Sequence, residues 1–122
     1  MRAIFLGVQR PFLHPPSETL RLESILYALA DPVRLEIVRR LATGDCPLNC
    51  STAAPAHLPK STQSHHFQIL REAGLVHSER RGTEVVNVLR LDEIEAKFPG
   101  VVSTILKAAK PLECPDAAKR GG

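Results

Sequence analysis

The sequence predicts a mainly α-helical domain that carries one small β-hairpin. Residues 60–73 combine a polar, almost uncharged N-terminal end with an apolar stripe at helical spacing. Residues 76–80 and 84–90 are β-branched and alternating around a glycine-containing turn, which predicts two paired strands. The tip of this hairpin is basic, Arg80-Arg81-Gly82-Thr83. A helix followed directly by a basic hairpin is the order of a winged helix-turn-helix.

Two helices are expected before this pair. Ser17 can cap the first, at about residues 18–30. Its apolar residues recur at helical spacing, namely Leu22, Ile25, Leu26 and Leu29. Asp31 and Pro32 then start a second helix, because the carboxylate caps free N–H groups and proline at the first helical position needs no donor. Gly44 ends that helix.

The remaining elements are short. Prolines interrupt the stretch from Cys46 to Pro59, so a third helix is expected only at 51–57. Asp92 can cap a final helical region, which Pro99 and Gly100 interrupt before a second apolar stripe continues to about residue 109. The chain then divides into three parts: an N-terminal arm at 1–16, a single domain at 17–110 and a disordered tail at 111–122.

Composition limits the class of protein. With 122 residues the chain has room for one domain, and with 4% aromatic residues its core must be mostly aliphatic. A net charge of +3 is compatible with a polyanionic partner. The apolar opening at 3–8 is far shorter than the roughly 18 residues of a membrane span. Three cysteines are too few for a disulfide scaffold, so we expect a cytoplasmic protein without a membrane partner.

Two segments carry a family resemblance. They are Ala28-Leu-Ala-Asp-Pro-Val-Arg-Leu-Glu-Ile-Val-Arg-Arg-Leu41 and Ser64-His-His-Phe-Gln-Ile-Leu-Arg-Glu-Ala-Gly-Leu-Val76, which together resemble the ArsR/SmtB family of bacterial repressors over residues 20–108. The resemblance implies a homodimeric winged helix-turn-helix that represses an operon and is released by an effector, often a metal ion. It also implies dimerisation through the first and last helices, and the two apolar stripes, larger than one small core needs, agree.

The sequence departs from the family at two prolines. A regular third helix usually stands where Pro55 lies, and a polar capping residue where Pro59 lies. We therefore expect a distorted third helix, and Ser61 can cap a slightly late recognition helix.

The predicted DNA contacts lie on the recognition helix and on the hairpin. Phe67 and Leu70 face inward, so the groove residues are the outward polar ones: Ser61, Thr62, Ser64, His65 and Gln68. Lys60 and the free N–H groups of the first turn suit a phosphate. Arg80 and Arg81 can enter the minor groove or follow the backbone. The alternative for that pair is a solvated turn, ion-paired with neighbouring glutamates.

Other polar residues have structural interpretations. His66 is adjacent to the inward face and is expected to bond a backbone carbonyl. Of Arg39 and Arg40, at the end of the second helix, one is expected to interact with the helix dipole.

The cysteines leave the effector open. The terminal helix at 101–110 contains no His, Asp, Glu or Cys, which argues against a zinc site between subunits there. Cys46 and Cys50 form a CxxxC, an incomplete ligand set that Cys114 or His57 can extend to bind a metal or metalloid ion. The same pair can form a redox-sensing disulfide or can simply pack in the loop. A small organic effector also remains open.

Catalysis is not expected, because the chain has no Gly-rich phosphate loop, no HExxH and no paired carboxylates. The rival to a DNA-binding regulator is a winged-helix protein-interaction module without DNA-binding activity.

Overall fold

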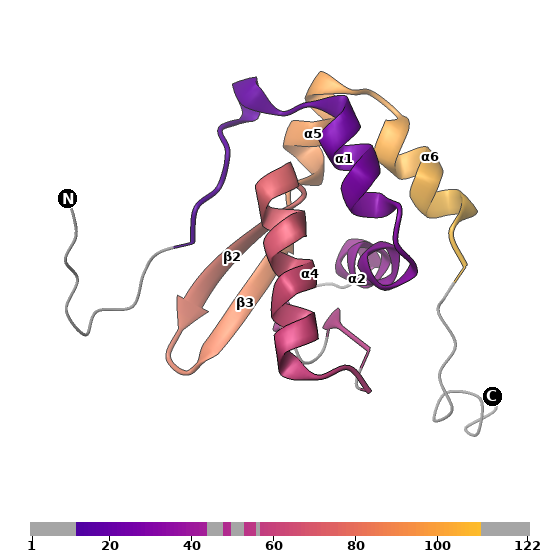
Figure 1. The fold of residues 1–122 in the computed structure, drawn as a ribbon. Coiled ribbons are helices and arrows are strands. Elements are labelled where there is room, and N and C mark those ends of the chain that lie inside the picture. Colours follow the sequence, from indigo (N-terminus) through magenta and orange to yellow (C-terminus); the bar gives the residue numbers. More distant parts are fainter. Residues whose placement is uncertain (1–11, 44–47, 50–52, 56, 111–122) are drawn as a thin grey trace.

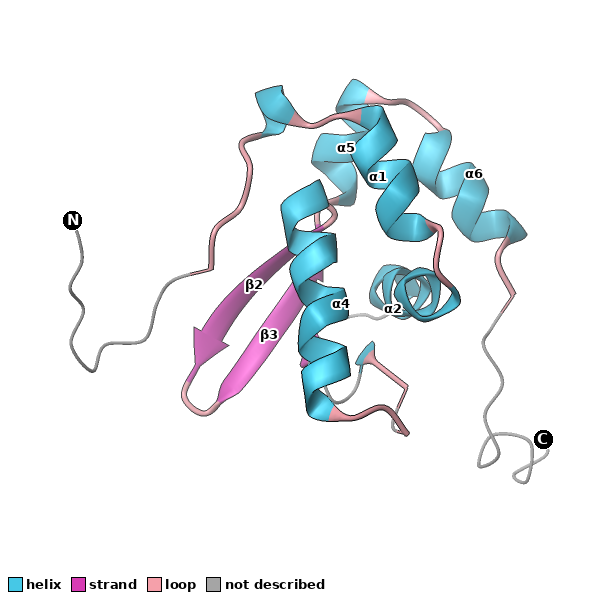
Figure 2. Cartoon of the chain, viewed as in Figure 1, coloured by secondary structure: helices cyan, strands magenta, loops and turns pink. Residues whose placement is uncertain are grey.

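The structure is a computed structural model that describes residues 12–43, 48–49, 53–55 and 57–110. Its elements are a 3₁₀ turn at Ser17–Thr19, α1 (Leu22–Leu29), α2 (Pro32–Thr43), β1 (Leu48–Asn49), α4 (Lys60–Ala73), β2 (Val76–Arg81), β3 (Glu84–Leu89), α5 (Leu91–Lys97) and α6 (Val101–Ala108). The β2–β3 hairpin lies on one side of α4, and α1 and α2 lie on the other (Figure 1). Helices dominate and strands form a small wing (Figure 2), which confirms the predicted fold class.

The first helix starts later than expected. Ser17 does not cap it; Ser17–Thr19 forms a 3₁₀ turn, and α1 begins at Leu22 after an extended Arg21. The extended segment places Leu20 in the core, where it is 3% exposed, and burying that side chain explains the later start.

The Asp31 cap of α2 is confirmed. Its Oδ2 accepts the backbone N–H of Val33 at 2.9 Å and that of Arg34 at 3.0 Å. The expected stop at Gly44 lies outside the described residues, as do residues 51, 52 and 56 of the expected helix at 51–57; of the other four, Ala53 alone is helical.

The helix α4 matches its predicted bounds. Pro59 occupies the N-cap position without a side-chain cap, so the late start at Ser61 was wrong. The backbone N–H of Gln63 nevertheless donates to the Pro59 carbonyl at 3.0 Å, which closes the first turn. Gly74 ends the helix with a φ of 89°, the left-handed conformation that glycine adopts without strain.

The sheet contains one strand more than expected. Strands β2 and β3 pair antiparallel with Arg81 opposite Glu84, so Gly82 and Thr83 form the predicted tight turn. Two residues of β1 add to the other edge of β3, where Leu48 pairs with Asn87. A two-residue strand in a proline-rich stretch has too little pattern to predict.

Asp92 is not the cap that the sequence suggested. It lies in the first turn of α5, whose N-cap position is Arg90. The break at Pro99 and Gly100 is confirmed, and the next helix receives its cap from Glu95. The Glu95 carboxylate accepts the backbone N–H groups of Gly100 at 2.8 Å and Ser103 at 3.3 Å.

The core is aliphatic apart from Phe67. It joins α1, α2, α4, α5 and α6 to the base of the hairpin, and its largest fully buried members include Ile25, Ile37, Phe67, Leu70, Leu75 and Ile94. The stripe of α1 is divided: Ile25 and Leu29 are buried, whereas Leu22 and Leu26 are 37% and 44% exposed. None of the helices in the described ranges is long and apolar enough to cross a membrane.

Candidate nucleic-acid interface

The outward face of α4 presents short hydrogen-bonding side chains to solvent. Phe67, Leu70 and Ala73 anchor the opposite face in the core. The exposed residues are Lys60, Ser61, Ser64, His65 and Gln68, while Thr62 is half-buried. These are the six α4 positions predicted from the sequence, and the structure brings all of them onto one helix. Such a face can donate to and accept from base edges in a major groove.

The outward face also carries one acidic residue that the prediction did not include. The Gln68 amide donates to the Glu72 carboxylate at 3.1 Å, one turn further along α4. The Gln68 amide, predicted to lie in the groove, is therefore held by its own helix when no DNA is bound.

The start of α4 is suited to an anion. Its first turn contains no acidic residue, and its first N–H groups have no partner within the helix. Gln63 points the other way and donates its side-chain amide to the Leu58 carbonyl at 3.0 Å, which fixes the loop before the helix.

The two arginines of the wing have different neighbours. Arg81 pairs with Glu79, with 3.1 Å between Nη2 and Oε1, as the alternative of an ion-paired turn expects. Arg80 lies over the Phe12 ring, with its guanidinium carbon 5.0 Å from the ring centroid. Both side chains remain exposed on β2.

Residues 12–14 of the N-terminal arm dock on the wing. Besides Arg80, Arg71 lies over the Phe12 ring at 4.4 Å. His14 stacks on His77 at 4.2 Å between centroids, and its Nε2 accepts the Ser78 N–H at 3.0 Å. Burial lowers the pKa of His14, and the charges of His77, Arg90 and Arg71 lower it further. A neutral imidazole therefore fits this position.

His66 is structural, but its partner differs from the backbone carbonyl that was expected. Its Nδ1 lies 3.3 Å from Arg34 Nη1 and 4.0 Å from Asp31 Oδ2. Burial lowers the pKa of His66; Asp31 opposes this shift, and Arg34 and His65 add to it. The contact joins α4 to the start of α2.

Arg34, which the sequence did not single out, connects three helices. It is 7% exposed, and its Nε donates to the Ala28 carbonyl at 2.7 Å. Because Pro32 has no N–H, the Ala28 carbonyl has no helical donor four residues later. In the sequence, only the position of Arg34 on the inward side of α2 indicates this role.

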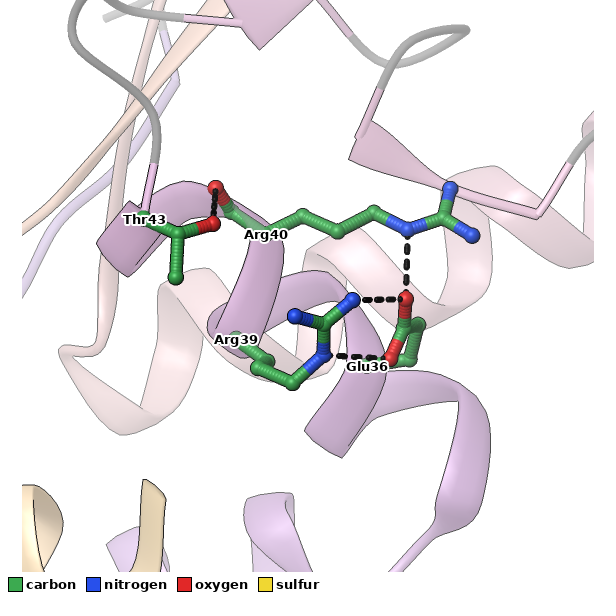
Figure 3. A network of polar contacts seen from close by, with 4 residues as sticks. All are labelled: Glu36, Arg39, Arg40 and Thr43. Atoms are coloured by element: carbon green, nitrogen blue, oxygen red, sulfur yellow. Dashed lines mark hydrogen bonds and ion pairs between the residues drawn. The ribbon is translucent and has the colours of Figure 1, made fainter. Parts of the chain in front are cut away.

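Arg39 and Arg40 both bind Glu36 (Figure 3), and Arg40 also lies in the last turn of α2, where the helix dipole favours a cation. The Glu36 side chain is 2% exposed. Its carboxylate accepts a hydrogen bond from Nη2 of Arg39 at 2.8 Å and another from Nε of Arg40 at 2.6 Å. The same hydrogen bond raises the pKa of Arg39. The two guanidinium groups therefore compensate a buried charge.

Cys46, Cys50 and Cys114 all lie outside the described residues. Within the described part of the chain, no group of three or more His, Cys, Asp or Glu side chains is placed to hold a metal ion.

Comparison with known proteins extends these observations. Residues 29–79 match a family model described as a helix-turn-helix domain. The chain is 34% identical over 82 residues to the HTH-type transcriptional regulator YceK of Bacillus subtilis, which covers 66% of this chain and 82% of that protein. It is 40% identical over 73 residues to the HTH-type transcriptional repressor SmtB of Mycobacterium tuberculosis, covering 59% of this chain and 53% of that protein.

Solved structures share the fold. An ArsR family transcriptional regulator superimposes with a TM-score of 0.57 at 22% identity, covering 73% of this chain and 98% of that one. The transcriptional repressor BigR from Xylella fastidiosa does so with a TM-score of 0.55 at 23% identity, covering 75% of this chain and 88% of that one.

Proposed function

The chain belongs to the ArsR/SmtB family of DNA-binding transcriptional regulators, and on that premise we propose that it acts as a homodimeric repressor released from its operator by an effector. The observation that supports operator binding best is the outward face of α4. Ser61, Ser64, His65 and Gln68 are exposed on one helix face, with uncharged donors and acceptors that match base edges.

Phosphate contacts complete the proposed interface. Lys60 stands at the start of α4, where the free N–H groups favour an anion. Arg80 and Arg81 lie at the end of β2, on the hairpin beside α4 (Figure 1). In this arrangement α4 supplies sequence preference and the wing supplies salt-dependent affinity.

The proposed dimer uses surfaces of α1 and α6. Leu22 and Leu26 are exposed on α1. On α6, Val101, Ile105 and Leu106 are only partly buried in this chain. A symmetric partner covers both apolar surfaces at once, and two copies of α4 then face two half-sites about one DNA turn apart, roughly 34 Å.

For the effector we propose that Cys46 and Cys50 respond either to a metal or metalloid ion or to thiol oxidation. Support comes from the sequence, since two thiols four residues apart can bind a soft ion or form a disulfide. Because both cysteines precede α4 by only 10 to 14 residues in the sequence, either event can change the pose of that helix.

Binding to DNA from the protein's own promoter at several salt concentrations tests the operator-binding proposal. Arg80→Ala should weaken binding to all duplexes and reduce the salt slope by about one. Gln68→Ala and His65→Ala should instead reduce the preference for the operator, by about 1–3 kcal/mol each. Arg21→Ala, which removes an exposed ion-paired arginine before α1, is the control and should leave the slope unchanged. Unchanged operator preference in both α4 variants contradicts the proposed groove contacts.

Operator release tests the effector. The DNA-bound protein is titrated separately with zinc, arsenite and an oxidant, and the titrations are repeated on the Cys46→Ser/Cys50→Ser double variant. The proposal expects one agent to release the wild-type protein and to fail on the variant. Equal release of both proteins would exclude the cysteines as the sensor.

A further inference from the structure

A groove separates α1 from α4 on the same side as the outward face of α4. Its volume is about 440 Å³, within the range of small-molecule sites. Glu23, Ser24 and Tyr27 of α1 line it from one side, and His65, Ile69, Glu72 and Ala73 of α4 line it from the other. The two helices are in contact with each other, and the buried Ala73 and half-buried Ile69 make part of the lining apolar.

The chemistry of the lining favours a cation with an apolar body. The Arg34 guanidinium lies over the Tyr27 ring, 5.4 Å from its centroid, but the side chain is still 64% exposed and can serve as an aromatic wall. The two acidic residues differ: Glu23 is already paired with Arg21, whereas the partner of Glu72 is the neutral amide of Gln68. Among the described residues that line the groove there is no lysine or arginine. An added ammonium group can therefore pair with Glu72 while its hydrocarbon part covers Ile69.

The groove is also connected to the predicted DNA-reading side chains. His65 belongs both to the groove wall and to the outward face of α4. Glu72 holds Gln68 through the hydrogen bond at 3.1 Å. A cation on Glu72 competes with that amide for the carboxylate, so a ligand in the groove changes two of the proposed base contacts without moving the helix.

We propose that this groove is a binding site for a small organic cation, an alkyl- or arylalkyl-ammonium, and that its occupation strengthens operator binding, because the cation releases Gln68 from Glu72. The proposal rests on the proposed function and adds a second input beside the two cysteines. The dimer leaves room for it, because Leu22 and Leu26 lie roughly a quarter turn around α1 from Glu23 and Tyr27. The helix can therefore pair with a partner on one side and line the groove on the other.

Tyr27 gives a direct readout of binding. It is the single tyrosine in the sequence, and there is no tryptophan, so intrinsic fluorescence reports on the groove. The full chain, without DNA, is titrated with cyclohexylmethylammonium and with cyclohexylmethanol, a neutral analogue of the same shape that does not fluoresce. We expect the ammonium to bind about fivefold more tightly, the factor that an exposed ion pair of about 1 kcal/mol provides. Glu72→Gln should remove that preference, and Glu18→Gln, an equal charge change on the exposed 3₁₀ turn, should retain it.

Any of three results would overturn the inference. If the alcohol binds as tightly as the ammonium, or if the Glu72 and Glu18 variants behave alike, the groove is not a cation site. If the ammonium binds selectively but does not raise operator affinity, the site does not regulate as proposed. Operator binding by the ligand-free protein is measured in the same series, so a failure of the proposed function itself is recognised separately.

Discussion

Replacing Arg34 with methionine tests whether one buried guanidinium holds α1, α2 and α4 together. The substitution keeps an unbranched apolar stem but removes every donor. The Tyr27 carbonyl, 3.4 Å from Arg34 Nη2, retains the Ala30 amide as a donor at 3.1 Å. The Ala28 carbonyl loses the 2.7 Å bond from Nε and has no helical amide to replace it, because Pro32 stands four residues later. The variant therefore leaves one buried carbonyl without a donor, which is the main loss, and also removes the 3.3 Å contact of Nη1 with Nδ1 of the half-buried His66.

The expected loss follows from that single carbonyl. A buried acceptor without a partner costs about 1–3 kcal/mol, and relief from burying the charge offsets part of it. We expect Arg34→Met to lower the free energy of unfolding by about 2 kcal/mol and the Tm by about 10 °C, since 1 kcal/mol corresponds to roughly 4–8 °C in a domain of this size. Urea and thermal unfolding followed by far-UV circular dichroism measure both quantities.

Arg21→Met is the control. The side chains of Arg21 and of its partner Glu23 are each 67% exposed, so the loss should stay well below that of Arg34→Met. If Arg34→Met is as stable as the wild type, or no less stable than Arg21→Met, then the Ala28 carbonyl is satisfied in another way and the reasoning fails.

Two further predictions concern a tight backbone approach and a titrating contact. Gly74→Ala should destabilise the protein by about 3 kcal/mol in urea unfolding, because Gly74 has a φ of +89° and an added Cβ would meet Leu20 Cδ2 at 2.1 Å. Gly82→Ala, with a φ of +65° and open space, should lose only about 1 kcal/mol; equal losses would contradict the role of Leu20. The lowered pKa of His14 means that the docked arm is stable above the ordinary histidine value of about 6.5 and loosens as the pH falls through the lower folded pKa. The chemical shift of the Ser78 amide should change with pH through this transition in the wild type and should show no such change in His14→Leu. A pH-dependent change that persists in the variant would mean that another group causes it.

The sequence predicted the elements whose signals are local. The Asp31 cap, the bounds of α4 and the tight turn at Gly82 each depend on neighbouring residues, so a short stretch of sequence is enough to predict them. Ser17 and Asp92 gave the same kind of local signal and were wrong, because the core determined where those helices begin. Burial of Leu20 outweighs one capping hydrogen bond.

What the sequence could not supply is contact between distant segments. Arg34 and His66 are 32 residues apart, and His14 and Ser78 are 64 apart. No periodicity or spacing relates such pairs. The strand β1 could not be predicted for a related reason, since its two residues become a strand only through their pairing with β3.

Contacts within the chain also determine how the predicted DNA-contacting residues act. Gln68 is held by Glu72, Arg81 by Glu79 and Arg80 by Phe12. DNA must therefore displace an intramolecular partner at each of these positions, so the net gain per contact is smaller than that of a free side chain. A mismatched sequence, which offers weaker acceptors, leaves the intramolecular partner in place. Exchange of this kind lowers the absolute affinity for DNA, which suits a regulator that must leave its site when conditions change.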